Sequence, residues 1–374
     1  MPFSVERVEN RGQLRQFIDL PFRLYSGDPN WVPPVRYFQR ELLDREKHPF
    51  HRHAEVEYFL ARGDSGRVVG RAASIVNRAH NEYHGERTGF FGFLELENDP
   101  ELASALMERC EETLRSAGMS RIRGPMNFST NEECGMLVKG FDGNPLIMMT
   151  YNPPWYPDLM DACGYVKVRD LFAYKLFSSL AAESRMARVA ELVKKRSNAV
   201  LRDISVRNIH LEVPLIMDIY NECWQDNWGF VPMTKEELDR MADELKMIMV
   251  PSMAPILEVD GQPVAFAVSI PDANQAMKKA GGSLFKLLLA MKVPFFKVRM
   301  DRSRVLLLGV RKAYRGRGFE ALLIDRIISS NVEQGVVWGE LSWILEDNAS
   351  MRKILERDLK AEQYRTYRIY EKDL

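Results

Sequence analysis

One segment of the sequence limits the possible folds more than any other. An apolar run at residues 305–310 meets a short turn rich in Gly and Arg, and a helical pattern follows from residue 318. The pattern predicts a buried strand that runs directly into a helix. Backbone N–H groups at a helix start point outward and carry partial positive charge, so they attract anions. Gly316 and Gly318 would let the backbone approach such a ligand closely.

The same turn carries four cations, Arg311, Lys312, Arg315 and Arg317. Charge-assisted hydrogen bonds from these side chains would add to the contacts of the helix start, so the junction predicts a pyrophosphate site. The alternative is a helix that begins in a basic surface segment and binds nothing. The glycine spacing matches neither the GxGxxG pattern of dinucleotide-binding folds nor the GxxxxGK[ST] pattern of P-loops.

The two halves of the chain repeat one order of patterns: helix, hairpin, strand, helix, strand, helix, strand. In the first half we expect these elements at 10–24, 56–76, 89–96, 100–117, 146–151, 158–163 and 168–176. A linking helix at 181–195 and a strand at 201–208 open the second half, which continues with two helices at 213–224 and 234–247 and then with 255–270, 304–310, 318–331, 339–345, 349–358 and 364–370. The order predicts an α/β (α+β) fold of two tandem lobes, 1–178 and 179–374, each a mixed, mostly antiparallel sheet flanked by helices.

Several motifs resemble one known family. The segment RGRGFE at 315–320 fits the pattern [Q/R]xxGx[G/A], except that Glu320 replaces the small last residue. WILEDN at 343–348 and YRIYEK at 367–372 resemble the family's fifth and closing strands, and DPNWVPP (28–34), RGPMNFSTN (123–131) and MTYNPPWY (149–156) extend the match. The chain resembles the GNAT (GCN5-related N-acetyltransferase) superfamily. Over its whole length it resembles the bacterial tandem-GNAT family that includes ceramide synthase-type acyl-CoA N-acyltransferases.

The resemblance implies acyl-CoA as co-substrate and no metal, with the CoA pyrophosphate on the Gly-Arg turn and the pantetheine amides along the preceding strand. The positions that it implies for CoA binding are Leu308, Gly309, Val310, Arg315, Gly316, Arg317, Gly318 and Phe319. A carboxylate beside a pyrophosphate is unfavourable, so Glu320 is expected to point away or to cap its helix. We expect Gly318→Asp to abolish CoA binding and to leave the fold intact.

Amide formation needs a deprotonated amine, a polarised thioester carbonyl and a proton for the leaving thiolate. A strand N–H at Val310 or a neighbour could hold the thioester oxygen. The catalytic candidates are Glu340, Glu346, Asn348 and Tyr367. The two glutamates flank one expected strand and could accept the amine proton through water; ordinary surface roles are the alternative. Many relatives carry a tyrosine as general acid where this chain has Leu355, so Tyr364, Tyr367, Tyr370 or a water would replace it.

The first half has no equivalent of the phosphate loop. After its apolar strand the chain reads ENDPE at 97–101, and three carboxylates there would repel a pyrophosphate. The first lobe is therefore predicted to be degenerate and to bind no CoA. Two segments could line the acceptor site, the polar loop at 127–134 and the aromatic segment at 223–232. The alternatives are a turn that satisfies its own hydrogen bonds and aromatic packing between helices.

An insertion at 280–304 separates the second hairpin from the CoA strand. Its apolar residues are Leu284, Phe285, Leu287, Leu288, Leu289, Met291, Val293, Phe295 and Phe296, and eight cations lie in or beside it with Asp301 as the opposing charge. Such a segment suits the headgroup region of an anionic membrane or a lid over a lipid chain. The alternative is a helix that packs on its lobe and leaves its lysines in water.

The bulk composition narrows the class of protein further. Lys plus Arg equals Asp plus Glu at 52 each, so no global charge favours nucleic acid. The four cysteines form no CxxC pair and are read as free thiols in a reducing cytoplasm, and neither zinc ligands nor a secretory signal is visible. No apolar run of membrane-spanning length occurs. We expect a cytoplasmic protein, with peripheral contact to the inner face of the cytoplasmic membrane left open.

Three functions remain open at this point. The first is acyl-CoA-dependent N-acylation of a long-chain (sphingoid) amine, as in ceramide synthesis. The second is N-acetylation of a small polar amine. The third is a non-catalytic CoA-binding protein, which Glu320 and Leu355 would favour because both depart from the family pattern.

Overall fold

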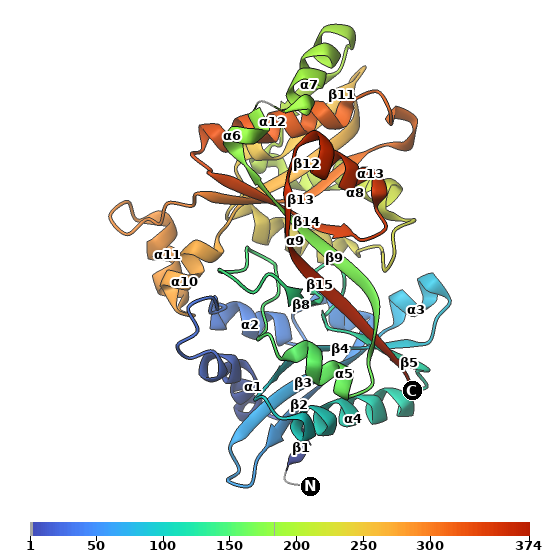
Figure 1. The fold of residues 1–374 in the computed structure, drawn as a ribbon, viewed down its shortest axis with the longest axis vertical. Coiled ribbons are helices and arrows are strands. Elements are labelled where there is room, and N and C mark those ends of the chain that lie inside the picture. The colour runs from blue at the N-terminus through green and yellow to red at the C-terminus, as the bar shows by residue number, and fades with distance from the viewer. Residues whose placement is uncertain (1–2, 183) are drawn as a thin grey trace. The chain divides into compact units, whose positions relative to one another are not determined.

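The computed structural model describes residues 3–182 and 184–374 (Figure 1). The chain packs into two compact units. Unit 1 contains Met1–Leu171, Ala276–Lys297 and Arg365–Leu374, and unit 2 contains Phe172–Gln275 and Val298–Tyr364. The expected division at 178/179 follows the repeat in sequence order. The packing instead returns two later segments to unit 1, because these segments make their contacts with residues of the first half.

The strands of unit 1 form a mixed sheet in the order β1-β2-β3-β4-β5-β15, with β8 also paired to β15. Their bounds are β1 Ser4–Arg7, β2 Ala54–Arg62, β3 Val68–Asn77, β4 Thr88–Leu96, β5 Arg121–Gly124, β8 Met136–Lys139 and β15 Glu362–Asp373, and β6 Met126–Asn127 pairs with β7 Glu133–Cys134 in a separate hairpin. β4 and β5 are parallel, and the other neighbours are antiparallel. The helices of this unit are α1 Arg11–Leu24, α2 Arg36–Leu43, η1 Pro49–Arg52, α3 Arg78–His84, α4 Pro100–Ser116, α5 Tyr156–Ala162 and α11 Leu284–Lys292, and α10 Asn274–Ala280 crosses into it.

Unit 2 repeats the arrangement with the strand order β14-β13-β12-β11-β10. The strands are β10 Val200–Asp203, β11 Pro255–Val259, β12 Gln262–Pro271, β13 Arg302–Val310 and β14 Trp338–Leu345, and β9 Val166–Phe177 enters from unit 1. β13 and β14 are parallel and the other pairs are antiparallel. The helices are α6 Ser178–Ala182, α7 Arg185–Arg196, η2 Val206–Asn208, α8 Ile209–Trp224, α9 Lys235–Lys246, η3 Pro251–Met253, η4 Lys312–Tyr314, α12 Phe319–Glu333, α13 Ala349–Lys353 and the π-helical turn η5 Ile354–Asp358.

Each unit therefore contains one parallel strand pair joined by a helix, β4-α4-β5 in unit 1 and β13-α12-β14 in unit 2. In unit 1, Leu102, Leu106 and Leu114 of α4 are fully buried in a core with the sheet. In unit 2, the apolar face of α12 packs into a second core with β11, β12 and η5. These findings confirm the predicted α/β fold with a mixed sheet and helices on its faces.

Local sequence signals set several helix starts. Asn10 caps α1 in a capping box with Gln13, and Thr234 caps α9 in a capping box with Glu237. Asp99 caps α4 by accepting hydrogen bonds from the backbone N–H groups of Glu101 and Leu102. These helices and the two predicted hairpins are confirmed.

The strand predicted at 146–151 is wrong, because these residues form an irregular loop. The nearby strand is β8, which the sequence analysis did not identify. β8 pairs with β15 and also forms hydrogen bonds with the side chain of Asn152. This side chain accepts from the N–H of Leu137 at 2.7 Å and donates to the Leu137 carbonyl at 3.0 Å, so an amide side chain supplies the hydrogen bonds of a strand.

Most of the insertion belongs to unit 1, although its place in the sequence is within the second lobe. Arg36 of α2 donates its backbone N–H to the carbonyl of Gly282 at 3.1 Å, and the ring of Phe22 lies against the same glycine. Lys278 donates to the carbonyl of Pro29. In Figure 1, α10 and α11 (orange) accordingly lie beside α1 and α2 (blue).

Candidate functional site

β13 and β14 run side by side only at their beginnings. Their parallel register joins Arg302–Val305 to Trp338–Leu341, with Val305 opposite Leu341 as its last pair. Residues 306–310 of β13 and 342–345 of β14 have no partner in this register. The edge of β13 that faces β14 therefore has no strand partner beyond Val305 in this register, and a ligand with amide groups could pair with it.

A β-bulge lies at the same point of β13. In the register with β12, Val268 faces Leu307 and Ser269 faces Val305, so Leu306 is an extra residue. A bulge redirects backbone groups and is common next to active sites. The N–H groups just after it lie where β13 leaves β14, and they are candidates to hold the thioester oxygen.

The turn after β13 has the geometry expected of a phosphate loop. Gly316 and Gly318 have φ of 76° and 81°, a region that other L residues rarely adopt. Gly318 is the N-cap of α12, and no side chain of the described residues caps this helix. The first N–H groups of α12 are thus available to an anion.

Two of the four expected cations are engaged elsewhere. Arg311 donates to the carboxylate of Glu222 at 2.7 Å, and the Lys312 ammonium donates to Asp226 at 2.8 Å. Burial by itself would raise the pKa of the Glu222 carboxyl. The hydrogen bonds from Arg311 and the Lys312 amide nevertheless hold the pKa of this carboxyl below its ordinary value. Arg311 and Lys312 therefore tie the turn to α8 and to Asp226 just after it.

The other two cations remain accessible. Arg315 and Arg317 are exposed. Arg315 donates to the carbonyl of Val310 at 3.2 Å, and Arg317 donates to that of Ala313 at 3.4 Å. Arg317 also lies 4.9 Å from the ring centroid of Tyr314. Each guanidinium keeps further N–H donors for an incoming phosphate.

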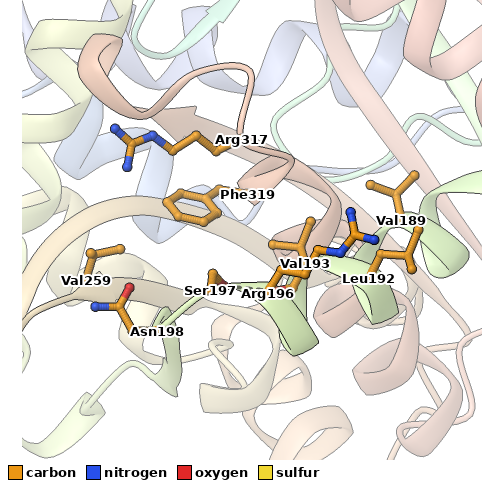
Figure 2. Close-up of a pocket in the computed structure, with 9 residues that line it drawn as sticks. All are labelled: Val189, Leu192, Val193, Arg196, Ser197, Asn198, Val259, Arg317 and Phe319. Atoms are coloured by element: carbon orange, nitrogen blue, oxygen red, sulfur yellow. Dashed lines mark hydrogen bonds between the residues drawn. The ribbon is translucent and has the colours of Figure 1, made fainter.

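A hollow of about 400 Å³ lies beside this turn (Figure 2). Figure 2 shows that Arg317 and Phe319 face it from the phosphate loop, and that Arg196, Ser197 and Asn198 face it from the end of α7 and the residues after it. Phe319 itself is buried and packs on Tyr314. The hollow has the size and the cationic edge to accept the nucleotide end of CoA. Arg196 was not among the sequence candidates, since α7 is distant from the turn in the sequence.

Gly309 is required by close packing. A Cβ at this position would come within 2.7 Å of the indole of Trp224. Trp224 stacks on Tyr220, and Tyr220 contacts Phe230. The aromatic segment at 223–232 is therefore engaged at least partly in packing under β13. The Val310 carbonyl accepts from Cys223 Sγ at 3.2 Å, and burial raises the pKa of that thiol.

The four catalytic candidates occupy different environments. Glu340 is fully buried opposite Arg304. Its carboxylate accepts from Ser342 Oγ at 2.7 Å and from the hydroxyl of Tyr364, and the Arg304 Nε lies 3.8 Å away. This geometry favours a positioning role for Glu340. The sequence could have indicated the pair, because Arg304 and Glu340 are charged residues inside two neighbouring apolar strands.

Glu346 and Asn348 follow the end of β14. Glu346 is half-buried, and its backbone carbonyl accepts from Arg352 at 3.1 Å. Asn348 is the N-cap of α13, where its side chain accepts from the N–H of Met351 at 3.1 Å. Leu355 is buried in the core of unit 2. Among the two glutamates, Glu346 is the one whose exposure permits contact with water.

Tyr367 is fully buried and belongs to unit 1, where it pairs with Leu137 of β8. Tyr364 belongs to unit 2 together with Glu340, Glu346 and Asn348. The structure thus groups three of the four catalytic candidates in unit 2 with the phosphate loop. The hydroxyl of Tyr364 donates a hydrogen bond to the Glu340 carboxylate, so Tyr364 contacts these candidates directly.

The corresponding junction of unit 1 is closed to anions. Asp99 occupies the N-terminus of α4, and Glu97 forms an ion pair with Arg67 at 3.0 Å. The polar loop at 127–134 is held largely by its own groups and by β4: Asn127 accepts from the N–H of Phe93 at 2.7 Å, and Glu132 accepts from that of Phe128 at 2.9 Å. Among residues 3–182 and 184–374, no group of three or more His, Cys, Asp or Glu side chains is arranged to hold a metal ion.

Comparisons with known proteins agree with this geometry. No family model matches the chain. A tandem GNAT protein from the clavulanic acid biosynthesis pathway superimposes with a TM-score of 0.60 at 13% identity, covering 99% of this chain and 98% of that one. A GCN5-related N-acetyltransferase from Sphaerobacter thermophilus superimposes with a TM-score of 0.55 at 14% identity, covering 100% and 96%. The chain therefore has the fold of a GNAT protein with two tandem units.

Two proteins with similar sequences identify the family. Protein YghO of Escherichia coli (strain K12) is 36% identical over 98% of this chain and 94% of its own length. The bacterial ceramide synthase of Caulobacter vibrioides (strain NA1000 / CB15N) is 35% identical over 99% of this chain and 97% of its own. The chain belongs to the GNAT-type acyltransferase family that contains these two proteins.

Proposed function

We propose that this protein transfers the acyl group of an acyl-CoA to the amino group of a long-chain, sphingoid-type amine. The amine nitrogen attacks the thioester carbonyl, the C–N bond of the amide forms, and the C–S bond breaks. The amine loses one proton, and the CoA thiolate gains one. The observation that carries the proposal is the open edge of β13 leading into a phosphate loop with two accessible arginines.

The residues divide into three groups by role. Leu308, Gly309 and Val310 would pair with the pantetheine, and residues 315–319 would hold the pyrophosphate. Glu346, acting through water, would accept the amine proton, while Asn348 positions the end of β14 by capping α13. Tyr364, which lies in unit 2 and donates a hydrogen bond to Glu340, would protonate the thiolate.

A lipid acceptor is supported by the name of one relative and by one surface. The segment 284–297, which we call the α11 surface, exposes 71% of Phe285, 91% of Phe295 and 47% of Phe296. Its lysines are Lys286, Lys292 and Lys297, all exposed. The sequence from 273 through 300 contains no Asp or Glu. Such a surface fits an anionic membrane, where an amine with a long hydrocarbon chain resides.

No helix among the described residues is long and apolar enough to cross a bilayer. We propose peripheral, reversible contact of the α11 surface with the inner face of the cytoplasmic membrane.

The test is an acyl transfer assay with purified protein. Sphinganine and a set of water-soluble amines would each be combined with acyl-CoAs from acetyl to palmitoyl, and the amide would be measured by mass spectrometry together with released thiol. We expect amide formation with sphinganine and one equivalent of thiol per amide. Activity restricted to acetyl-CoA and small polar amines would replace the proposal with the second function, and CoA binding without any transfer would favour the third.

A further inference from the structure

The helix α7 carries an excess of positive charge next to the phosphate loop. Its sequence holds five cations and a single acid, Glu191, whereas the whole chain has equal numbers of acidic and basic residues. The five cations are Arg185, Arg188, Lys194, Lys195 and Arg196. A cluster of like charges on one helix of a neutral chain favours contact with a negatively charged partner.

Two of these cations are neutralised by neighbouring acids. Lys194 forms an ion pair with Asp325 of α12 at 3.0 Å, and Arg185 is paired with Asp358 at 3.2 Å. The other cations of α7 are all exposed, and no ion pair or hydrogen bond to another described residue engages their side chains. These cations are Arg188, Lys195 and Arg196. Their charge is therefore available to an incoming molecule.

α7 packs directly against the turn proposed to bind phosphate. A Cβ at Gly318, the N-cap of α12, would lie 2.8 Å from Cγ2 of Val193. Figure 2 shows Leu192 and Arg196 of α7 around the same hollow as Arg317 of the phosphate loop. The entrance of the CoA site and the cations of α7 therefore belong to one surface of unit 2.

Arg188, Leu192 and Lys195 form one stripe along this surface, which we call the α7 stripe. Residues three and four positions apart are neighbours on a helix, and Leu192 is 52% exposed between the two cations. Arg188 and Lys195 lie outside the lining of the hollow, so a nucleotide held in the hollow does not explain them. An apolar residue between accessible cations is instead a surface that complements an acidic protein.

We propose that the α7 stripe docks an acidic carrier protein, which holds its acyl group as a thioester on a 4′-phosphopantetheine arm. This inference rests on the proposed function and names a second acyl donor for it. CoA and such a carrier share the phosphopantetheine thioester, so either arm can lie along β13 with its phosphate at residues 315–319. Beyond the phosphate, CoA continues into a nucleotide, whereas the carrier continues into a protein whose acidic surface would face Arg188 and Lys195.

The chemical step is the same for both donors. The amine nitrogen attacks the carrier-bound thioester carbonyl, the C–N bond forms, and the C–S bond breaks. The amine loses one proton, and the thiolate of the phosphopantetheine arm gains one.

The experiment compares palmitoyl-CoA with palmitoyl-loaded acyl carrier protein as donors to sphinganine over a range of salt concentrations. The amide is measured by mass spectrometry. We expect transfer from both donors. Transfer from the loaded carrier should decline more steeply as salt rises, because salt screens attraction between exposed charges.

Reversal of two charges of the α7 stripe separates the donors. Arg188→Glu/Lys195→Glu should lower kcat/KM for the loaded carrier by about 10-fold at low salt and leave that for palmitoyl-CoA within about twofold. Arg207→Glu/Lys246→Glu is the matched control, because it changes the net charge equally at exposed cations of η2 and α9. It should leave both donors within about twofold of wild type.

Transfer from palmitoyl-CoA with none from the loaded carrier would overturn the docking assignment. An equal loss for both donors in the Arg188→Glu/Lys195→Glu variant would also overturn it, because the cations would then serve CoA itself. The same holds if the variant treats the donors alike but no longer floats with anionic vesicles, which would assign the stripe to lipid.

Calorimetry with the loaded carrier, without any amine, tests docking separately from transfer. We expect binding that weakens with salt and is about 10-fold weaker in the Arg188→Glu/Lys195→Glu variant. Absence of binding would overturn the docking assignment. Absence of transfer from either donor would instead reject the proposed function, and carrier binding would then still decide the role of the stripe.

Discussion

Glu340 lies within β14 and Glu346 directly follows it, and we expect neutralisation of the two carboxylates to have different effects because their surroundings differ. Glu340→Gln removes the charge that faces buried Arg304 and the acceptor of Ser342 and Tyr364. Breaking a buried pair by removing one partner typically costs about 3–5 kcal/mol. We expect the free energy of unfolding of this variant to fall by that amount in urea denaturation.

Glu346→Gln is the complementary variant. Its side chain is half-buried at the end of β14, so the free energy of unfolding should change by less than about 0.5 kcal/mol. If Glu346 accepts the amine proton, kcat should fall by about 10²–10⁴-fold with little change in KM for acyl-CoA. An unaltered kcat in this variant would exclude Glu346 as the general base.

Arg315 and Arg317 provide a direct test of the phosphate loop. Each charge-assisted hydrogen bond is worth about 1.5–3 kcal/mol, so Arg315→Ala and Arg317→Ala should each weaken CoA binding by about 10–100-fold. Arg326→Ala is the control, since Arg326 lies on α12, the helix that follows the turn, and pairs with Asp203. Calorimetric titration with CoA measures all three, and equal effects of the three substitutions would contradict the site.

The structure changes one expectation about this loop. Gly318→Asp was expected to leave the fold intact, but Gly318 has φ of 81°, and a Cβ there would lie 2.8 Å from Val193 Cγ2. Strain and a clash would accompany the loss of binding, so this variant cannot separate the two effects. The arginine substitutions avoid the difficulty.

At the scale of elements, α11 and the residues after it can be tested for membrane contact. Replacement of Phe295 and Phe296 by Ser should abolish flotation with vesicles that contain anionic lipid, because these rings are exposed and would insert among the headgroups. Replacement of Lys286, Lys292 and Lys297 by Gln should weaken flotation and remove most of its salt dependence.

Leu211→Ser is a suitable control for this experiment. Leu211 is 71% exposed on α8, and the change removes a similar apolar side chain from a different surface. Flotation that survives the change at Phe295 and Phe296 would exclude the α11 surface as the contact.

The elements differ in how far the sequence determined them. α1, α4 and α9 were predictable because their caps are local, as were β13 and α12 because an apolar run meets a Gly-Arg turn. The loop at 146–151 was mistaken for a strand because its apolar residues are buried by tertiary contacts without strand pairing. β8 was missed because it has four residues and its strand partner, β15, lies near the end of the sequence.

The candidate site, like the fold, could be predicted from the sequence only in part. The phosphate loop lies in one continuous segment, so its residues could be identified together. Arg196 and the group of Arg304, Glu340 and Tyr364 come from separate segments, and only their pairing in space reveals them.

For the whole molecule, the repeat predicts a single CoA per chain. The α12 N-terminus lacks a side-chain cap among the described residues, whereas Asp99 satisfies the equivalent N–H groups of α4. Native mass spectrometry with CoA should therefore show one bound molecule, and none in the Arg315→Ala/Arg317→Ala double variant. A second bound CoA that persists in the double variant would show that unit 1 also binds.

The return of residues 365–374 to unit 1 has a consequence for synthesis on the ribosome. β5 pairs with the end of β15, and Arg365 donates to the carbonyls of Gly140, Asp142 and Gly143 at 3.0, 2.7 and 2.8 Å. These groups lack their partners until the corresponding codons have been translated. Unit 1, although translated first, is completed last, and an unpaired edge of β5 remains exposed while more than 200 further residues emerge. The nascent chain thus presents an aggregation-prone strand edge throughout that interval.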